Sequence, residues 1–273
     1  MRTRLMILVM SLGVAVCATA EPAATSGGQP QPTVESQRAE LYPKVSKYLA
    51  EAAALEPAFL TPQLEYPKEG LLPGWRDKVC PQVTGLPHPH AEFVLARLSQ
   101  VARAVGVRTD AEHCSPNLFV YATDRPNDVL RSLVTKNSYF TFGPRGIPYL
   151  LDQFAAMPQP VRVWYNIYGR GTAITRVLVI VDKTRLQGAT IGQLADYVSM
   201  VSFAEIRPDA RLDDAPTILK LFDGASKAAP AGLSAWDQAF LKSLYTNSWA
   251  KPWRRELGKT DPLALSMVSE IVP

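Results

Sequence analysis

Ile174-Thr-Arg-Val-Leu-Val-Ile-Val-Asp182 is the stretch that decides the fold. It is apolar without a break from Val177 to Val181. A short apolar run rich in β-branched residues predicts a strand that is buried on both faces. We therefore place this strand at the centre of the fold.

A helix is predicted directly after this strand, across a short loop that reaches Gly188. Thr190 and Gln193 have the spacing of a capping box, which fixes where the helix begins. Apolar residues then recur at helical spacing as far as Ile206. They are Ile191, Leu194, Ala195, Val198, Val201 and Ala204.

The same two periodicities predict the elements around this unit. On the N-terminal side we expect a helix near Pro43 with this proline in its first turn, a helix over 91–105 and a strand over 117–123. A helix opened by Pro126 comes next, and a strand over 161–168 then turns back as a hairpin into the central strand. After the central helix we expect a short helix near 215–222 and a helix capped by Ser234 and Asp237.

These elements predict a single α+β domain over 75–246, in which several helices pack on a mixed β-sheet. Its length is ample for one core. Residues 21–35 are rich in Pro, Gly, Ser and Thr, so we expect a disordered linker. Residues 36–74 are expected to form an N-terminal helix and a Pro-rich arm, and residues 247–273 an irregular C-terminal tail.

The first twenty residues have the features of a secretory signal peptide. Arg2 and Arg4 supply its positive charge, and the apolar run that follows is too short to span a bilayer comfortably. Ala18-Thr-Ala20 is a small-residue cleavage site, so we expect the mature chain to begin at Glu21 and to be periplasmic or secreted. Cleavage as a lipoprotein at Cys17 is the competing interpretation, and Val16 is a poor residue for it.

Two cysteines, Cys80 and Cys114, remain after this cleavage. A pair of cysteines in an exported chain is typical of one disulfide, because thiols oxidise and stay oxidised outside the cytosol. The bridge would close a loop of about 35 residues, which corresponds to roughly 3–4 kcal/mol of stabilisation in the loop-entropy model. Two unpaired buried thiols are the alternative.

Charge and composition exclude some classes of protein. Removal of Arg2 and Arg4 lowers the formal net charge from +4 to +2. A chain so close to neutral is not typical of a nucleic-acid-binding protein, which shows a concentrated basic face. The mature chain contains no second apolar run of membrane-spanning length, and no residue pattern indicates a cofactor.

Three histidines, His88, His90 and His113, are the candidates for a metal site. Imidazole suits zinc, and an H-x-H pair on an extended loop can bind it. The other interpretation is that Pro87-His-Pro-His90 is an exposed rigid loop. His113 adjoins Cys114, which is already assigned to the bridge, so we do not predict a metal site.

Motifs of nucleophilic catalysis and phosphate binding are missing. The sequence has no G-x-S-x-G, and no serine falls in a sharp turn between a strand and a helix. Gly169-Arg170-Gly171 lacks the lysine and the following helix of a phosphate loop. Asp196 and Glu205 are nine residues apart on the predicted helix, so they do not form a carboxylate pair.

Aromatic residues on the hairpin are the candidates for ligand binding. Trp164, Tyr165 and Tyr168, with Arg162 and Arg170, could line a groove for a sugar or a peptide. The alternative, which we favour, is that these rings pack under a helix.

Several segments resemble a family of uncharacterised secreted proteins of proteobacteria. They are Glu112-His-Cys-Ser-Pro-Asn-Leu-Phe-Val-Tyr-Ala-Thr123, Pro126-Asn-Asp-Val-Leu130, Val179-Ile-Val-Asp182, Gln193-Leu-Ala-Asp-Tyr-Val-Ser-Met-Val201 and Trp236-Asp237. The resemblance covers most of the chain from Trp75 to Tyr245. It implies an exported protein and carries no activity.

A second and more distant resemblance concerns layout only. A strand, a loop, a helix and then Pro208-Asp209 and Asp213-Asp214 are similar in order to a zincin metallopeptidase. That class has H-E-x-x-H on the helix, whereas the matching positions here fall near Ala195, Asp196 and Ser199. The resemblance therefore implies neither zinc binding nor peptidase chemistry.

From the sequence we expect a non-catalytic exported protein that binds a ligand or supports an envelope assembly. The alternative from another class is an envelope hydrolase that uses His88, His90 or His113 with a nearby carboxylate. A third hypothesis, an adhesion module, requires an exposed aromatic patch around Trp164 and Tyr168.

Overall fold

The structure is a computed structural model. It describes residues 31–53, 72–110, 113–136, 148–168, 173–186, 188–207, 210, 212, 214–223, 230–246 and 261–273. Residues Thr33–Pro273 make up one compact unit. Within the described residues this unit contains seven α-helices and a five-stranded, mostly parallel sheet, which confirms the predicted single-domain α+β class.

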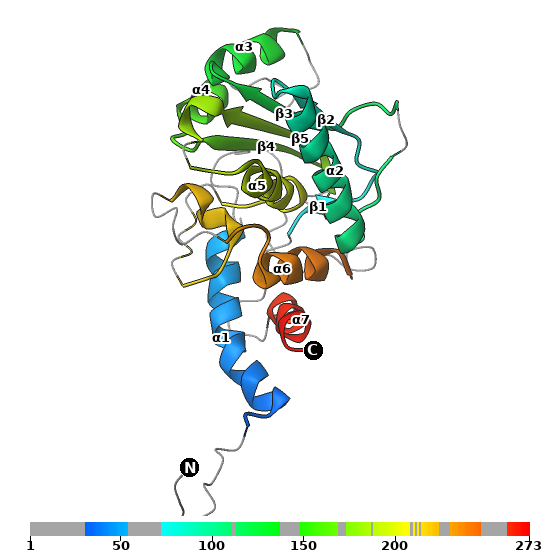
Figure 1. The fold of residues 1–273 in the computed structure, drawn as a ribbon, viewed down its shortest axis with the longest axis vertical. Coiled ribbons are helices and arrows are strands. Elements are labelled where there is room, and N and C mark those ends of the chain that lie inside the picture. The colour runs from blue at the N-terminus through cyan, green and yellow to red at the C-terminus, as the bar shows by residue number, and fades with distance from the viewer. Residues whose placement is uncertain are drawn as a thin grey trace, which may run out of the picture. The chain divides into compact units, whose positions relative to one another are not determined.

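The predicted central strand is the centre of the sheet (Figure 1). β5 (Ala173–Asp182) pairs in parallel with β3 (Leu118–Thr123) and in antiparallel with β4 (Val161–Tyr168), so these two strands flank it. β2 (Pro81–Thr84) pairs in parallel with the outer edge of β3. A two-residue strand, β1 (Gly74–Trp75), pairs with the start of β5. The expected hairpin between β4 and β5 is thus confirmed.

Side chains alternate along these strands between two separate apolar clusters. Val177, Val179 and Val181 belong to the larger cluster, whereas Leu178 and Ile180 point to the opposite face and belong to the smaller one. All five are essentially inaccessible to solvent. The prediction that this strand is buried on both faces is therefore confirmed.

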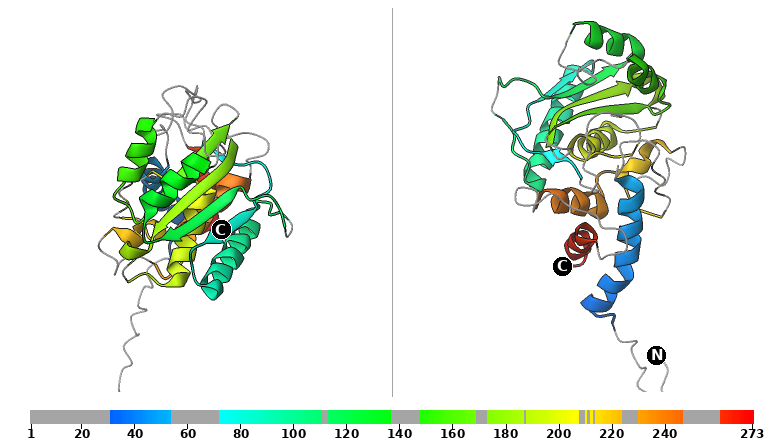
Figure 2. Two further views of the ribbon diagram at one scale, coloured as in Figure 1. Left: turned by 90° about the horizontal axis from the view of Figure 1, so that it is seen from above. Right: turned by 180° about the vertical axis from the view of Figure 1, so that it is seen from behind.

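Helices cover both faces of the sheet, as the two views of Figure 2 show. α2 (His88–Val105), α5 (Ile191–Phe203) and α6 (Ala235–Thr246) contribute their apolar faces to the larger cluster. α3 (Pro126–Lys136) and α4 (Pro148–Ala156) contribute to the smaller cluster. The sheet is the middle layer of three.

The first and last helices belong to the same compact unit. α1 (Val34–Ala52) and α7 (Pro262–Ile271) pack against each other, and α7 also packs against α6. Tyr48 meets Trp236 and Phe240 edge to face, with ring centroids 5.7 and 6.0 Å apart. The expectation of an irregular tail is wrong for its last part, because α7 supplies buried Leu263, Ala264, Met267 and Val268.

Local capping signals set two helix starts as predicted. Thr190 Oγ1 accepts a hydrogen bond from Gln193 N, and Gln193 Oε1 accepts one from Thr190 N, each at 3.1 Å. Ser234 and Asp237 exchange the same reciprocal pair at 3.1 and 2.9 Å. α5 ends at Phe203, three residues before the predicted end, because Ala204 is extended and Ile206 bridges to Ala53.

Other elements differ from the prediction. α1 begins at Val34 with Thr33 as its N-cap, so Pro43 lies inside the helix and not in its first turn. The segment near 215–222 forms a 3₁₀ helix, η3 (Ile218–Phe222). β1, β2 and α4 were not predicted.

No helix of the described residues is long and apolar enough to cross a membrane.

Candidate functional site

The three histidines do not converge. His88 and His90 lie in the first turn of α2 and not on an extended loop, as Pro87 and Pro89 are tolerated at a helix start. Residues two apart on a helix point to different sides, so H-x-H cannot present two ligands here. His113 is exposed beyond the other end of α2. Among the described residues no three His, Cys, Asp or Glu side chains are grouped to hold a metal ion.

The aromatic residues of β4 do not form an exposed groove. Trp164 is 3% exposed and packs edge to face on Phe154 of α4, with centroids 5.6 Å apart. Tyr165 is 7% exposed and belongs to the cluster on the opposite face of the sheet. The side chains of Tyr168 and Arg170 lie outside the described residues. Packing under helices, the favoured interpretation, is thus confirmed for Trp164 and Tyr165, and the adhesion hypothesis loses the exposed Trp164 that it requires.

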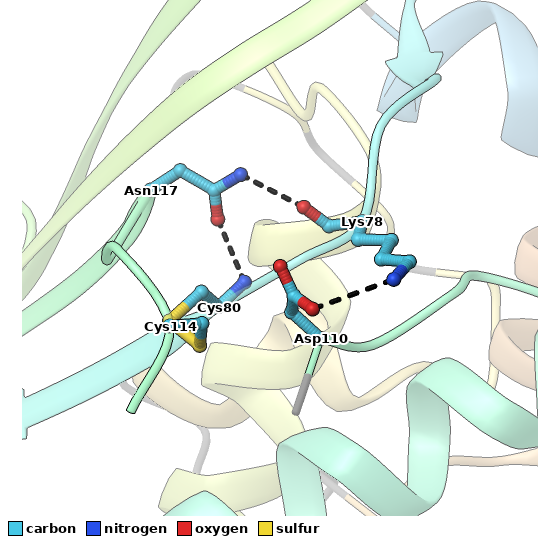
Figure 3. Close-up of a disulfide and its surroundings, with 5 residues drawn as sticks. All are labelled: Lys78, Cys80, Asp110, Cys114 and Asn117. Carbon is cyan, nitrogen blue, oxygen red and sulfur yellow. Dashed lines mark hydrogen bonds and ion pairs between the residues drawn. A yellow bond between two sulfur atoms is a disulfide. The ribbon is translucent and has the colours of Figure 1, made fainter. Parts of the chain in front are cut away.

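The predicted Cys80–Cys114 pairing agrees with the geometry. The two Cα atoms are 6.0 Å apart, within the range of a disulfide (Figure 3). Cys80 directly precedes β2 and Cys114 lies just before β3, so the bridge joins the starts of two paired strands. Asn117 holds the same two segments, because its Oδ1 accepts from Cys80 N at 2.8 Å and its Nδ2 donates to Lys78 O at 2.9 Å.

The carboxyl ends of the parallel strands offer the best position for a site. The helix that follows β2 is α2, which packs on one face of the sheet, and the helix that follows β3 is α3, which packs on the other face. Neighbouring parallel strands whose connections leave to opposite faces form a crevice, and ligands of open α/β sheets bind at such a point. The starts of α2 and α3 both lie at this edge, after Thr84 and Thr123.

Charged side chains follow this carboxyl edge from strand to strand. Lys183, just after β5, pairs with Asp124, just after β3, at 3.4 Å. Asp182, the last residue of β5, accepts hydrogen bonds from Thr184 N at 3.1 Å and from Thr184 Oγ1 at 2.6 Å. His88 Nδ1 lies 3.5 Å from Glu92 Oε2 at the start of α2. These three carboxylates thus each have a partner.

Arg162 is the unusual residue of this edge. It is 4% exposed and lies on the face of the sheet that α3 and α4 cover. Its Nη1 donates to Asn127 Oδ1 in the first turn of α3 at 3.0 Å and to Ala155 O at the end of α4 at 2.6 Å. Its buried Nε has no hydrogen-bond partner. Burial lowers the pKa of the Arg162 guanidinium, and the nearby charge of Asp182 opposes this shift.

A cluster of buried polar groups lies at the C-terminal end of α5. Four carbonyls at the end of this helix accept hydrogen bonds from aromatic side chains. Tyr165 Oη reaches Val201 O and Ala204 O at 2.6 and 2.9 Å, Trp75 Nε1 donates to Ser202 O at 2.8 Å, and Tyr245 Oη donates to Phe203 O at 2.6 Å.

Glu205 follows these four residues and is 7% exposed. Its Oε2 has no hydrogen-bond partner, and burial raises the pKa of the Glu205 carboxyl to about 8. Burial also raises the pKa of the Tyr165 hydroxyl well above its ordinary value, and the neighbouring Glu205 adds to this effect. The carboxyl is therefore protonated at neutral pH.

The other buried carboxylates hold the fold together. Asp196, in the middle of α5, pairs with Arg97 of α2 and accepts from Leu233 N at 3.0 Å. Asp237 accepts from Thr217 Oγ1, Ile218 N and Ser234 Oγ, so it joins η3 to the start of α6. As predicted, Asp196 and Glu205 do not form a carboxylate pair.

The sequence drew attention to Arg162 only as one member of an aromatic groove. A local signal was present, since an arginine at the second position of an alternating strand faces the same side as Trp164, which is a buried position. Glu205 gave no such signal, because its burial depends on elements that are distant in the sequence.

No family model matches the chain, and no curated protein or solved structure matches it significantly.

Proposed function

We propose that the protein is an exported, non-catalytic binding protein of the periplasm or the extracellular space. The observation that carries the binding role is the carboxyl edge of the parallel strands β2 and β3, where α2 and α3 begin and leave to opposite faces of the sheet. The signal-like residues 1–20 and the placement of Cys80 and Cys114 support export. The histidines and buried carboxylates considered above lie apart from one another or serve the fold, which supports a role without catalysis.

Export is tested by expressing the whole chain with its own first twenty residues in a Gram-negative host. We expect a periplasmic or secreted product whose mass corresponds to a chain that begins at Glu21. Its two cysteines should react with a maleimide only after reduction. Cytosolic protein that retains Met1 and has two reactive thiols would contradict this part of the proposal.

The non-catalytic role is tested on the purified mature protein with panels of peptide, ester and glycan substrates. We expect no turnover above a buffer control. Saturable turnover that one substitution of a polar residue abolishes, for example Glu205→Gln, would overturn the proposal.

The alternative is an envelope hydrolase, and the contact of His88 with Glu92 at the carboxyl edge favours it. An imidazole beside a carboxylate can act as a general base or as a metal ligand. Metal analysis of protein purified without a tag separates the two proposals. A stoichiometric zinc ion that is lost in His88→Ala or His113→Ala would favour the hydrolase.

A further inference from the structure

We propose that the Cys80–Cys114 bridge exchanges with an external dithiol while the protein stays folded, and that Cys114 is the sulfur that the dithiol attacks. A thiol oxidoreductase of the extracytoplasmic space, with two cysteines of its own, is the partner for this chemistry. The inference goes beyond the proposed binding function and rests only on the part that concerns export. It is carried by the unequal exposure of the two cysteines and by the contacts that hold their segments.

The two cysteines of the bridge differ in exposure. Cys80 is 4% exposed, whereas Cys114 is partly exposed and lies beside residues that are all exposed, His113, Ser115 and Pro116. In thiol–disulfide exchange the rate depends on which sulfur an incoming thiolate can reach. The interior of the protein screens Cys80 from such an attack, so the open approach is at Cys114.

The segment of Cys80 is held in place on both sides without the help of the bridge. On one side Cys80 N donates to Asn117 Oδ1 at 2.8 Å (Figure 3). On the other side Val79 N donates to Arg108 O at 2.8 Å, and Val79 O accepts from Asp110 N at 3.0 Å. Because the Cα atoms of the two cysteines are 6.0 Å apart in this frame, the sulfur atoms stay within reach of each other when the bond between them opens. The bridge can therefore open and close again in the folded protein.

The exchange proceeds in two steps and needs no reagent besides the dithiol. A thiolate of the dithiol attacks Cys114 Sγ, the bond between the two Sγ atoms breaks, and Cys80 leaves as a thiolate that takes up a proton. The second thiol of the partner then loses its proton and attacks the partner's own sulfur in the mixed disulfide, which releases Cys114 as a thiol. The bridge thus gains an electron pair and both protons, and the dithiol becomes a disulfide.

The burial of Cys80 also decides how long the mixed disulfide lasts. A thiolate on Cys80 has little hydration, and a buried charge without a partner is unfavourable. Cys80 therefore returns readily to the mixed disulfide and restores the bridge, until the second thiol of a dithiol completes the reduction. A monothiol such as glutathione should accordingly reduce the bridge much less than a dithiol does.

The experiment compares Cys80→Ser with Cys114→Ser, each as the folded mature protein, with oxidised glutathione as the probe and mass spectrometry as the readout. The glutathione adduct should form on Cys114 of the first variant at least about tenfold faster than on Cys80 of the second, because buried cysteines are inert. In urea that unfolds both variants the two rates should be alike, which is the matched control. Equal rates in the folded state, or a faster reaction at Cys80, would overturn the assignment of Cys114.

The wild type supplies a second test that does not depend on the folding of a variant. Dithiothreitol should open the bridge of the native protein at a rate that stays constant as urea is raised below the unfolding transition, because direct attack requires no unfolding. A rate that rises with urea throughout this range would show that the bridge opens only in unfolded molecules, which contradicts the proposal. Two free thiols in the purified exported protein would contradict the bridge itself, so this failure is distinguishable from a bridge that forms and does not exchange.

Discussion

Glu205 shows how one buried side chain makes stability depend on pH. The unfolded carboxyl ionises near its ordinary pKa of 4.5, whereas the folded one keeps its proton up to about pH 8. Between these values the folded state binds more protons than the unfolded state. The free energy of unfolding therefore falls as the pH rises through this window, and it stays lower above pH 8.

Glu205→Gln should remove this dependence, because the amide is similar in size and cannot ionise. Relative to the wild type we expect the free energy of unfolding of the variant to rise by roughly 1 kcal/mol per pH unit between pH 5 and 8, measured by urea unfolding. The raised pKa of Asp237 adds a slope of its own, which both proteins share. Glu35→Gln, at an exposed position of α1, is the matched control. Parallel pH profiles of Glu205→Gln and the wild type would contradict the prediction.

At the scale of the element, β2 and β3 are joined in two independent ways, by a disulfide and by hydrogen bonds of the Asn117 side chain. The disulfide restricts the unfolded chain, while Asn117 makes hydrogen bonds in the folded state to both Cys80 N and Lys78 O. Asn117 N and Leu118 N add contacts to Cys80 O at 3.1 and 3.2 Å. We therefore expect the two strands to stay paired when the bridge is lost.

Replacing both Cys80 and Cys114 with serine should lower the free energy of unfolding by roughly 3–4 kcal/mol, with an unchanged far-UV circular dichroism spectrum. Asn117→Ala in this background should lower it further, since two backbone groups lose their side-chain partner. Ser115→Ala, at an exposed position two residues away, is the control. A double serine variant that loses its β-sheet signal would show that the hydrogen bonds alone do not hold the strands.

The elements that could be predicted from the sequence are those whose signal lies within their own residues. The strand of β5 is uniformly apolar, and α5 and α6 begin with capping boxes whose partners are three residues apart. β2 gave no such signal, because a four-residue strand that starts with Pro81 is defined only by its pairing with β3. The sequence predicted that the helix after β2 begins at residue 91, later than α2 does, because its two prolines favour a loop. Proline is nevertheless allowed in the first turn of a helix.

The candidate site was harder to predict than the fold. Arg162, Asn127 and Ala155 belong to three elements, and only the packing of α3 and α4 on β4 brings them together. Glu205 likewise lies beside a contact between distant segments, because Ile206 bridges to Ala53 and Arg207 N donates to Ala52 O at 2.9 Å. Contacts of this kind have no periodicity that a single sequence could show.

At the scale of the whole molecule, α7 is part of the core, and two leucines of this one helix test that statement. Leu263 is fully buried and Leu265 is 48% exposed. Leu263→Ala should lower the free energy of unfolding by about 2–5 kcal/mol, whereas Leu265→Ala should change it by no more than about 0.5 kcal/mol. Urea unfolding of both variants measures the difference. Equal values would show that α7 does not contribute to the core.

The pairing of α1 with α7 has a consequence for how the chain reaches its final state. Arg38 Nε donates to Val272 O across 234 residues, and Tyr42 Oη accepts from Asp261 N at 2.8 Å. A polypeptide leaves the ribosome with its N-terminus first, so α1 emerges before residues 262–271 have been made. Until then α1 lacks the contacts that it makes with α7, although Tyr48 can already pack on Trp236 and Phe240 of α6. Any nascent chain that is shorter than this therefore lacks the packing of α1 against α7.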